Sequence, residues 1–233
     1  GEKQMPYENL VVVKDKIDVS IVVPLLNEAE SLPELYQRIV ASLEGAGISF
    51  EVVFVDDGSR DNSFETIRRL RENDDRVRAI RFRRNYGKSA ALAVGFEAVR
   101  GDAVVTMDAD LQDDPAEVPR MVGLLGTGYD LVSGWKKTRK DSLSKRFSSK
   151  LFNWVTGFVS GLRLHDFNCG LKAYRSNVVG AIPIYGELHR YLPVLAHWAG
   201  FRVTETPVLH HPRKHGRSQF GLGRCTHGFL DLI

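Results

Sequence analysis

Three short apolar runs in the first half of the chain are each followed within four residues by a cluster of polar residues. The runs cover residues 19–23, 50–55 and 103–106, and each is rich in valine. Near-continuous apolar strands of this kind are typical of a parallel sheet that helices cover on both faces. The sequence therefore predicts an α/β fold built on a mostly parallel, twisted sheet.

Helical patterns separate these runs, as the crossovers of a parallel sheet require. Pro24 closes the first run, Ser31 and Glu34 form a capping-box pattern at the start of the first helix, and Gly45 and Gly47 end that helix. The other expected helices cover residues 63–72, 90–99, a segment that begins at 115, 141–159 (a basic stretch) and 187–198. The other expected strands cover residues 77–82, 130–133, 170–174 and 202–208.

The polar clusters after the three runs are residues 27–28, 56–57 and 108–110. In a parallel sheet, ligands bind beyond the carboxyl ends of the strands. Three clusters that converge on one edge indicate a site more strongly than any one of them alone.

The most acidic stretch, residues 107–114, holds four aspartates and Gln112. Carboxylates crowded at a strand's end repel one another, and partial burial increases the cost. Hard oxygen ligands with a carboxamide nearby suit Mg²⁺ or Mn²⁺, and Mg²⁺ usually combines one or two carboxylates with substrate phosphates. The stretch therefore indicates an enzyme that handles a diphosphate; the alternative is a solvated acidic turn. Asp108 and Asp110 would share a face if the chain were extended here.

Basic residues gather in two segments, although the net charge of the 233 residues is only +3. Residues 136–150 hold seven lysines and arginines against one acid, and residues 210–224 hold four, with three histidines and no acid. Such segments suit phosphates, nucleic acid or an anionic membrane surface; the alternative for each is a solvated basic face.

The cysteines bear on the cellular compartment, and the two ends of the chain bear on the limits of the domain. Cys169 and Cys225 lie far apart, give no paired metal-ligand spacing and favour a reducing, cytosolic environment. There is no signal-peptide pattern and no run of about 18 apolar residues. We expect residues 1–18 to be an N-terminal extension. Residues 223–233 stop inside an apolar pattern, which predicts the start of an amphipathic, juxtamembrane helix of a longer parent protein.

Several common motifs are excluded. No G-x-G-x-x-G follows a strand, so a Rossmann dinucleotide site is not expected. Gly87-Lys88-Ser89 resembles the end of a P-loop, but that motif requires glycine where this chain has Phe82. The chain has no G-x-S-x-G nucleophile elbow, and its seven histidines show no zinc-binding spacing.

Six segments, taken in order, resemble the family 2 glycosyltransferases, and most closely the polyprenyl-phosphate sugar transferases of the dolichol-phosphate mannose synthase group. They are residues 23–28, 55–59, 85–88, 108–112, 165–172 and 211–218. The resemblance implies a GT-A catalytic domain at 19–222. It also implies a GDP- or UDP-linked sugar donor, Mg²⁺ or Mn²⁺, a polyprenyl phosphate acceptor, inversion at the anomeric carbon, and work at the cytosolic face of a membrane.

Within this resemblance, the donor side is expected at the loops that leave the strands. The expected donor-binding residues are Pro24, Leu26, Asn27, Glu28, Asp57, Lys88 and Asp108, and the expected metal ligands are Asp108, Asp110 and Gln112. Asp57 would accept hydrogen bonds from the base or the ribose, and Lys88 would reach a phosphate. The alternatives are a helix N-terminal charge for Glu28 and a solvated lysine for Lys88.

The acceptor side is expected in the second half. The expected ligands of the acceptor phosphate or donor diphosphate are Arg146, Arg190, Arg213, Lys214 and Arg217, and the expected catalytic residues are Asp110, Asp166 and Arg146. Asp166 would be the base for a hydroxyl acceptor, or would orient the acceptor or contact the metal; its alternative is a turn residue. A lipid phosphate is largely anionic at neutral pH and needs little help from a base. The basic loop around residues 216–218 is expected to close over the diphosphate.

Three rival functions stay open. The same fold could serve a hydroxyl acceptor in polysaccharide or glycoconjugate synthesis. A nucleic-acid-binding module is disfavoured, because the acidic edge would repel a polyanion and no aromatic residues interleave the basic ones. A nucleotidyltransferase would need a basic, glycine-rich loop where the chain has residues 25–28. The donor sugar (GDP-mannose, UDP-glucose and UDP-N-acetylglucosamine all fit) and the oligomeric state are not determined by the sequence.

Overall fold

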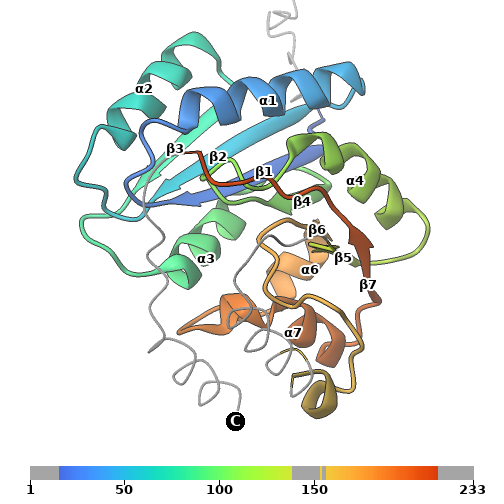
Figure 1. The fold of residues 1–233 in the computed structure, drawn as a ribbon. Helices are drawn as coiled ribbons and strands as arrows, with labels where there is room; N and C mark the ends of the chain where they lie inside the picture. The colour runs from blue at the N-terminus through green and yellow to red at the C-terminus, as the bar shows by residue number, and fades with distance from the viewer. Residues whose placement is uncertain (1–15, 138–152, 154–155, 215–233) are drawn as a thin grey trace, which may run out of the picture.

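The computed structural model describes residues 16–137, 153 and 156–214. Their strands form one seven-stranded sheet of order β3-β2-β1-β4-β6-β5-β7 (Figure 1). The strands are β1 (Val19–Leu25), β2 (Phe50–Asp56), β3 (Val77–Arg81), β4 (Ala103–Thr106), β5 (Leu131–Trp135), β6 (Lys172–Arg175) and β7 (Val203–Pro207). The α-helices are α1 (Leu32–Gly45), α2 (Ser63–Asn73), α3 (Lys88–Ala98), α4 (Val118–Gly126), α6 (Ser176–Ala181) and α7 (Leu192–Trp198), and the 3₁₀ turns are η1 (Pro115–Glu117) and η2 (Leu188–Arg190).

Strands β1 to β4 pair in parallel, as predicted. Strand β1 lies between β2 and β4, and Val19 pairs with both Phe50 and Ala103, so the three strands begin at one edge and end at the other. Every residue of these three strands is buried, which explains their near-continuous apolar sequences.

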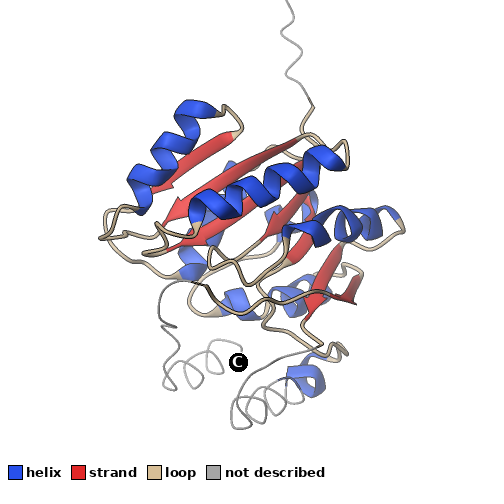
Figure 2. Cartoon of the chain, turned by 45° about the horizontal axis from the view of Figure 1, so that its top comes forward, coloured by secondary structure: helices blue, strands red, loops and turns tan. Residues whose placement is uncertain are grey.

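The side chains of β1 alternate between the two faces of the sheet. Ile21 and Val23 pack into a core with α1, α2 and α4, whereas Val22 faces a second core with α3, α6 and α7. Figure 2 shows the helices on both sides of the sheet. The predicted α/β architecture, with a mostly parallel sheet covered on both faces, is therefore confirmed.

The second half of the chain adds one reversed strand. Strand β6 runs antiparallel to both β4 and β5, while β7 pairs in parallel with β5. Lys172, the first residue of β6, therefore lies opposite Thr106, the last residue of β4. The loop that enters β6 thus reaches the same edge of the sheet as the loops that leave β1, β2 and β4.

Two local predictions near the first strand were wrong. Strand β1 does not stop before Pro24 but continues to Leu25; beyond Val22 it pairs only with β2, where a proline is more easily accepted than between two partners. The Ser31 side chain makes no capping bond to α1. Its hydroxyl instead donates to the backbone carbonyl of Glu28 at 2.9 Å and to the Glu28 carboxylate at 3.2 Å.

The second half departs further from the predicted elements. The helix expected over 187–198 is divided into η2 and α7, because Pro193 suits the first turn of a helix but not its interior. The sequence analysis does not predict α6, which is only six residues long. Residues 138–152 of the expected basic helix and residues 215–233 lie outside the described part. Within the described ranges, no helix is long and apolar enough to cross a membrane.

A buried ion network joins the strands at the edge where they begin. The Glu51 carboxylate of β2 is 1% exposed and accepts hydrogen bonds from the Ser20 hydroxyl (2.7 Å), the Arg100 guanidinium (2.7 and 2.9 Å) and the Arg78 guanidinium (3.2 Å). Gly101 permits this close packing, since a Cβ there would lie 2.6 Å from the backbone nitrogen of Ser20. Burial alone would raise the pKa of Glu51, but the bonds from Arg100 and Ser20 outweigh it and lower the pKa.

We predict that Glu51→Gln lowers the free energy of unfolding by about 2 kcal/mol at pH 7, because the amide group turns an N–H toward donors that are left without an acceptor. Since the folded pKa is the lower one, the stabilisation by Glu51 is present above its ordinary pKa of 4.5 and is lost as the pH falls below that value. Urea denaturation at pH 7 and pH 4 measures both effects. Glu65→Gln, in the exposed pairs of α2, is the matched control and should change stability by less than about 0.5 kcal/mol; an equal effect of both variants would contradict the prediction.

Candidate active site

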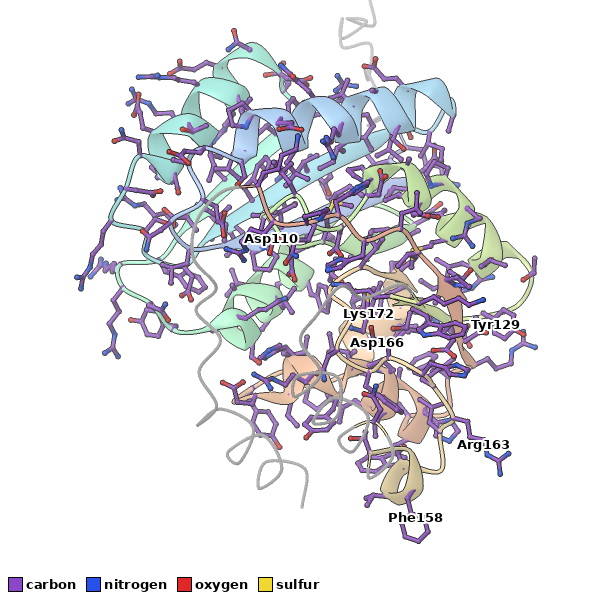
Figure 3. The ribbon with its side chains drawn as sticks, in the orientation of Figure 1. Asp110, Tyr129, Phe158, Arg163, Asp166 and Lys172 are labelled. Atoms are coloured by element: carbon purple, nitrogen blue, oxygen red, sulfur yellow. The ribbon has the colours of Figure 1, made fainter. Side chains whose placement is uncertain are left out.

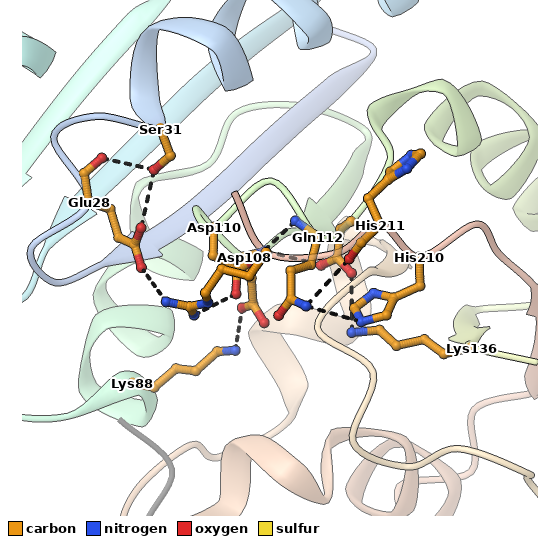
Figure 4. A network of polar contacts seen from close by, with 11 residues as sticks. Glu28, Ser31, Lys88, Asp108, Asp110, Gln112, Lys136, His210 and His211 are labelled. Carbon is orange, nitrogen blue, oxygen red and sulfur yellow. Dashed lines mark hydrogen bonds and ion pairs between the residues drawn. The ribbon is translucent and has the colours of Figure 1, made fainter. Parts of the chain in front are cut away.

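The three predicted polar clusters meet at one edge of the sheet. Strands β1, β2 and β4 end at Leu25, Asp56 and Thr106, and the backbone N–H of Asp57 donates to the carbonyl of Leu25 at 2.9 Å, which ties the first two loops together. Figure 4 shows Glu28, from the loop after β1, close to Asp108 and Asp110, from the loop after β4, with basic side chains among them. The sheet topology thus produces the convergence that the sequence predicts.

The acidic loop after β4 is a turn, not an extended segment. Residues 109 and 110 are in the turn, and Leu111 has a φ of +62°, a left-handed conformation that is costly for a leucine. The backbone N–H of Gln112 donates to the Asp110 carboxylate at 3.1 Å. The expectation of an extended chain with Asp108 and Asp110 on one face was therefore wrong, and each carboxylate has a different cationic partner.

Asp108 is paired with Lys88, which α3 carries on its first residue (Figure 4). Burial alone would raise the pKa of Asp108, but Lys88, Lys136 and Lys172 together hold that pKa well below its usual range. Gly170 permits the neighbouring loop to lie against this carboxylate, since a Cβ at residue 170 would come within 2.5 Å of it. Asp108 is therefore an ionised group at neutral pH, with lysines around it.

Asp110 is paired with Arg213, whose guanidinium Nη2 lies 2.7 Å from its carboxylate. The same guanidinium lies 3.4 Å from the carboxylate of Glu28. Burial raises the pKa of both acids, and the Asp108 and Asp110 charges raise that of Glu28 further, against the opposing effect of Arg213. The two acids are thus close enough to repel each other, and a cation between them offsets the repulsion.

Two lysines with little exposure lie beneath the acidic loop, Lys136 with a side chain 12% exposed and Lys172 at 3%. Lys136 follows β5 and is 3.3 Å from the Asp113 carboxylate, and Lys172 opens β6 and donates to the backbone carbonyl of Cys169. Burial alone would lower the pKa of Lys136, but Asp113 and its neighbours raise it, whereas burial lowers the pKa of Lys172. The sequence analysis assigned no role to either lysine in the site. The sequence did contain a signal for them: each lysine lies at one end of a buried strand, and a lysine in such a place needs an acid nearby.

Asp166, expected as a base or an acceptor-orienting group, is 2% exposed and accepts a hydrogen bond from the backbone N–H of Asn168 at 3.1 Å. Figure 3 shows it beside Lys172, in the loop region that leads into β6. Its charge contributes to the environment of both Lys136 and Lys172. This placement favours a role in holding the lysines over direct access to an acceptor.

A segment that follows β7, residues 208–214, lies across the acidic loop and is called the strap here. His210 forms an isolated antiparallel bridge with Asp113, and the backbone N–H of His211 donates to the carbonyl of Gln112 at 2.8 Å. The His211 ring lies 2.8 Å from the Asp114 carboxylate. The strap therefore places Arg213 over Asp110, although more than 100 residues separate the two in the chain.

The remaining expected ligands are placed in different ways. Asn27 has a φ of +58°, and its amide oxygen accepts from the backbone N–H of Arg60 at 2.8 Å, so it shapes the loop after β1. Pro24 is buried in β1 and Leu26 is partly exposed beyond it. Arg190 is 9% exposed and lies 3.4 Å from the Glu187 carboxylate. Lys214 reaches Glu34 on α1 at 2.6 Å, and Arg146 and Arg217 lie outside the described residues.

The donor atoms at this edge fit a hard dication that also binds a substrate. In the described part of the chain, no three histidine, cysteine, aspartate or glutamate side chains form a ready-made metal cage. Asp108, Asp110 and Gln112 do offer two carboxylates and one amide, and Mg²⁺ ordinarily takes one or two carboxylates and completes its shell with water and substrate phosphates. The residues therefore fit a metal that enters together with a diphosphate.

A model of the protein family described as "Glycosyl transferase family 2" matches residues 20–181. The chain belongs to glycosyl transferase family 2. An undecaprenyl-phosphate 4-deoxy-4-formamido-L-arabinose transferase of Pseudomonas paraeruginosa is 41% identical to this family 2 chain over 216 residues, 92% of the chain and 64% of that protein. A protein of the same name from Edwardsiella ictaluri is 40% identical over 216 residues, 92% of the chain and 66% of that protein. The chain thus spans slightly less than two thirds of the length of these relatives.

Solved structures resemble this family 2 domain in fold. Glucosyl-3-phosphoglycerate synthase from Mycobacterium tuberculosis, in complex with Mn²⁺, UDP and phosphoglyceric acid, has a TM-score of 0.64 at 20% identity and covers 86% of this chain and 72% of its own. A mannosyltransferase from Pyrobaculum calidifontis, in complex with GDP-Man and Mn²⁺, has a TM-score of 0.64 at 22% identity and covers 88% of this chain and 59% of its own. The predicted GT-A fold is therefore confirmed, and both of these glycosyltransferases were solved with Mn²⁺.

Asp57 in this family 2 site holds a loop in place. One carboxylate oxygen accepts from the backbone N–H of Tyr86 at 2.7 Å, and the other accepts from that of Gly87 at 2.9 Å. Gly58 lies against the same loop, since a Cβ there would come within 2.5 Å of the backbone of Arg84. Gly87 is the N-cap of α3 and has no side-chain capping bond of its own. Asp57 therefore sets the start of α3, and with it the position of Lys88.

We predict that Asp57→Asn increases amide hydrogen exchange of residues 84–88 by about tenfold, because an amide cannot accept from two backbone N–H groups at once. Hydrogen–deuterium exchange followed by mass spectrometry measures the change. Asp75→Asn, on the exposed turn before β3, is the charge-matched control and should leave the same peptide unchanged. Unchanged protection in Asp57→Asn would mean that the carboxylate does not hold this loop.

His189 links η2 to the start of α3. Its backbone N–H donates to the Ser89 hydroxyl at 3.2 Å, and its ring Nδ1 lies 2.9 Å from the same hydroxyl, an arrangement that suits a neutral ring accepting from serine. Burial, and then the nearby charges of Lys88 and Arg190, lower the pKa of His189 to about 3. His189 is therefore neutral at physiological pH.

Because the folded pKa of His189 lies below the ordinary 6.5, the unfolded chain binds a proton first as the pH falls. The stability that the neutral ring provides is complete above pH 6.5 and is lost progressively toward pH 3. We predict that, between pH 6.5 and pH 5, the free energy of unfolding falls further in the parent than in His189→Gln. The difference between the two falls should be at most about 2 kcal/mol. Urea denaturation at both values tests this. His197→Gln, at an exposed position of α7, should retain the parent's pH dependence; equal pH slopes for the parent and His189→Gln would refute the assignment.

Proposed function

We propose that this family 2 chain transfers one sugar, with inversion, from a nucleotide-diphosphate sugar to a polyprenyl phosphate. The observation that carries the proposal is the meeting of Glu28, Asp108 and Asp110 with Lys88 and Arg213 at the edge where nucleotide ligands of α/β sheets bind. The names of the relatives, which are undecaprenyl-phosphate sugar transferases, support the acceptor class. Because this acceptor is a lipid, we also propose that the protein works at the cytosolic face of a membrane.

The donor would occupy the mouth formed by the loops after β1, β2 and β4. The nucleoside would lie toward Asn27, Glu28 and Asp57, and the diphosphate toward Asp108 and Asp110. Mg²⁺ or Mn²⁺ held by Asp108, Asp110 and Gln112 would supply positive charge for the leaving diphosphate. GDP and UDP both stay candidates, since the similar structures carry one or the other.

The chain's own cations have a separate part in this reaction. Lys88 and Arg213 already face the acids that would bind the metal, so both can contact phosphate oxygens once a diphosphate lies among them. The acceptor phosphate carries negative charge at neutral pH, so its oxygen can attack the anomeric carbon without a base to remove a proton. The buried place of Asp166, 2% exposed, is consistent with an acceptor of this kind.

The alternative is a GT-A enzyme with a hydroxyl acceptor. A hydroxyl needs a carboxylate within hydrogen-bond reach to take its proton. Asp166 would have to turn out of its buried position beside Lys172 to serve as that base. The described site therefore favours the phosphate acceptor.

The acceptor class is tested with matched pairs of acceptors. The chain is incubated with Mn²⁺, a short polyprenyl phosphate or the corresponding polyprenol, and a panel of nucleotide sugars that includes GDP-mannose, UDP-glucose, UDP-N-acetylglucosamine and nucleotide-linked 4-deoxy-4-formamido-L-arabinose. We expect one donor to give product with the phosphate and none with the alcohol, and a chelator to stop the reaction. Product with hydroxyl acceptors alone would favour the alternative.

We predict that Asp110→Asn lowers turnover at least about 100-fold and removes metal-dependent donor binding, because the variant loses one of two carboxylates for the metal. Its melting temperature should be near or above the parent's, since repulsion among the acids falls. Asp102→Asn, an exposed acid before β4, is the control and should keep both properties. Normal turnover in Asp110→Asn would remove Asp110 from the metal site.

A further inference from the structure

Arg213 is the cation that Glu28 and Asp110 share. These two acids lie in the donor mouth, the space among the loops after β1, β2 and β4. Its guanidinium lies 2.7 Å from Asp110 and 3.4 Å from Glu28, while the two carboxylates are only 10% and 14% exposed. Figure 4 shows the ion pairs of Glu28 and Asp110 side by side. A planar guanidinium can donate to two carboxylates at once, which a lysine ammonium does less well. Arg213 thus stands where a dication bound to Asp110 would be attracted.

The position of Arg213 depends on the metal loop itself. The strap that carries it is bonded to residues 112–114 through the bridge of His210 to Asp113, the backbone bond of His211 to Gln112 and the contact of the His211 ring with Asp114. Arg213 follows these contacts by two residues. The guanidinium is therefore held on the acids by the same loop that supplies the expected metal ligands.

A dication on Asp110 and the guanidinium in its present place would be close to each other and would repel. A dication alone brings no new partner for Arg213, so the two cations compete for the same carboxylates. A diphosphate that arrives with the dication adds negative charge and gives the guanidinium phosphate oxygens to bind. The competition is then relieved, and the binding of metal and of diphosphate is coupled.

We propose that Arg213 is the resident counter-cation of the donor mouth, which weakens binding of a free dication and makes metal binding conditional on a nucleoside diphosphate. This inference rests on the proposed function only in its choice of diphosphate as the second ligand. Arg213 is a positioning residue in the metal-free state and a phosphate ligand in the loaded state.

Lys214 provides a matched control within the strap. It carries the same charge, one residue away, but its ammonium lies 2.6 Å from Glu34 on α1. A variant that removes this charge changes the net charge as much as one at Arg213 and leaves the ion pairs of Asp110 and Glu28 in place. Comparison of the two separates direct competition from a general effect of positive charge.

The experiment is a titration of the full chain with Mn²⁺, in which electron paramagnetic resonance measures the free ion, first alone and then with UDP or GDP. We expect Arg213→Gln to bind Mn²⁺ alone about tenfold more tightly than the parent, and to lose about tenfold in affinity for the nucleoside diphosphate in the presence of Mn²⁺. Lys214→Gln should bind Mn²⁺ alone as the parent does. Arg213→Lys, which keeps the charge but not the fork, should lie between the parent and Arg213→Gln.

Equal or weaker binding of Mn²⁺ alone by Arg213→Gln would overturn the proposal, as would equal tightening in Lys214→Gln or no Mn²⁺ binding by any variant. Thermal melting of each variant checks that it is folded, and Arg213→Lys tests the same idea with a smaller change. The titration contains neither sugar nor lipid. Sugar transfer by the parent together with unchanged Mn²⁺ binding in Arg213→Gln would therefore defeat this inference alone, whereas tightening without sugar transfer would defeat the proposed function alone.

Discussion

The constraint on which the rest of the structure depends is the crowding of acids where parallel strands end. Pairing of β1 with β2 and β4 in one register brings the loops of Glu28, Asp57 and Asp108–Asp110 to one edge. Partly buried carboxylates at such distances repel one another, so the fold is stable only if positive charge is supplied among them. Among the described residues, four segments supply it: α3 with Lys88, the residue after β5 with Lys136, β6 with Lys172, and the strap with Arg213.

The reversed direction of β6 serves the same requirement. A parallel strand next to β4 would present its start at the far edge, and its first residues would be remote from the acids. As an antiparallel strand, β6 begins at the acidic edge, so Lys172 and the loop before it lie against Asp108. At β6 the residues that matter to the site therefore lie at the start of the strand and before it, whereas Lys136 and Arg213 follow β5 and β7 as the acids of the first half follow their strands.

This difference explains how much of the molecule was predictable. The parallel strands, the helices between them and the edge where the acids meet follow from local patterns: apolar runs of a strand's length, helical spacing and polar residues shortly after each run. The direction of β6 depends on tertiary packing that the patterns do not report. The split of 187–198 did have a local signal, Pro193 inside the helical pattern, which the sequence analysis did not use. The Ser31 capping box failed because Ser31 has helical backbone angles (φ −87°, ψ −27°), not the extended ones from which an N-cap oxygen accepts a bond from a backbone N–H of the first turn.

The charged residues of the site show the remaining limit of local sequence. Arg190 and Arg213 were given the same role from their residue type, yet Arg190 is 9% exposed beside Glu187, while Arg213 bridges Glu28 and Asp110 at the open mouth. Asp57 and Asp110 are both buried acids after strands, but Asp57 directs its oxygens to backbone N–H groups and Asp110 directs one to a side-chain cation. Backbone donors stay with the loop that carries them, whereas a side-chain cation can turn to another anion. The acids paired with Lys88 and Arg213 are therefore the ones whose charge can become available to an arriving metal, and Asp57 is the one whose charge cannot.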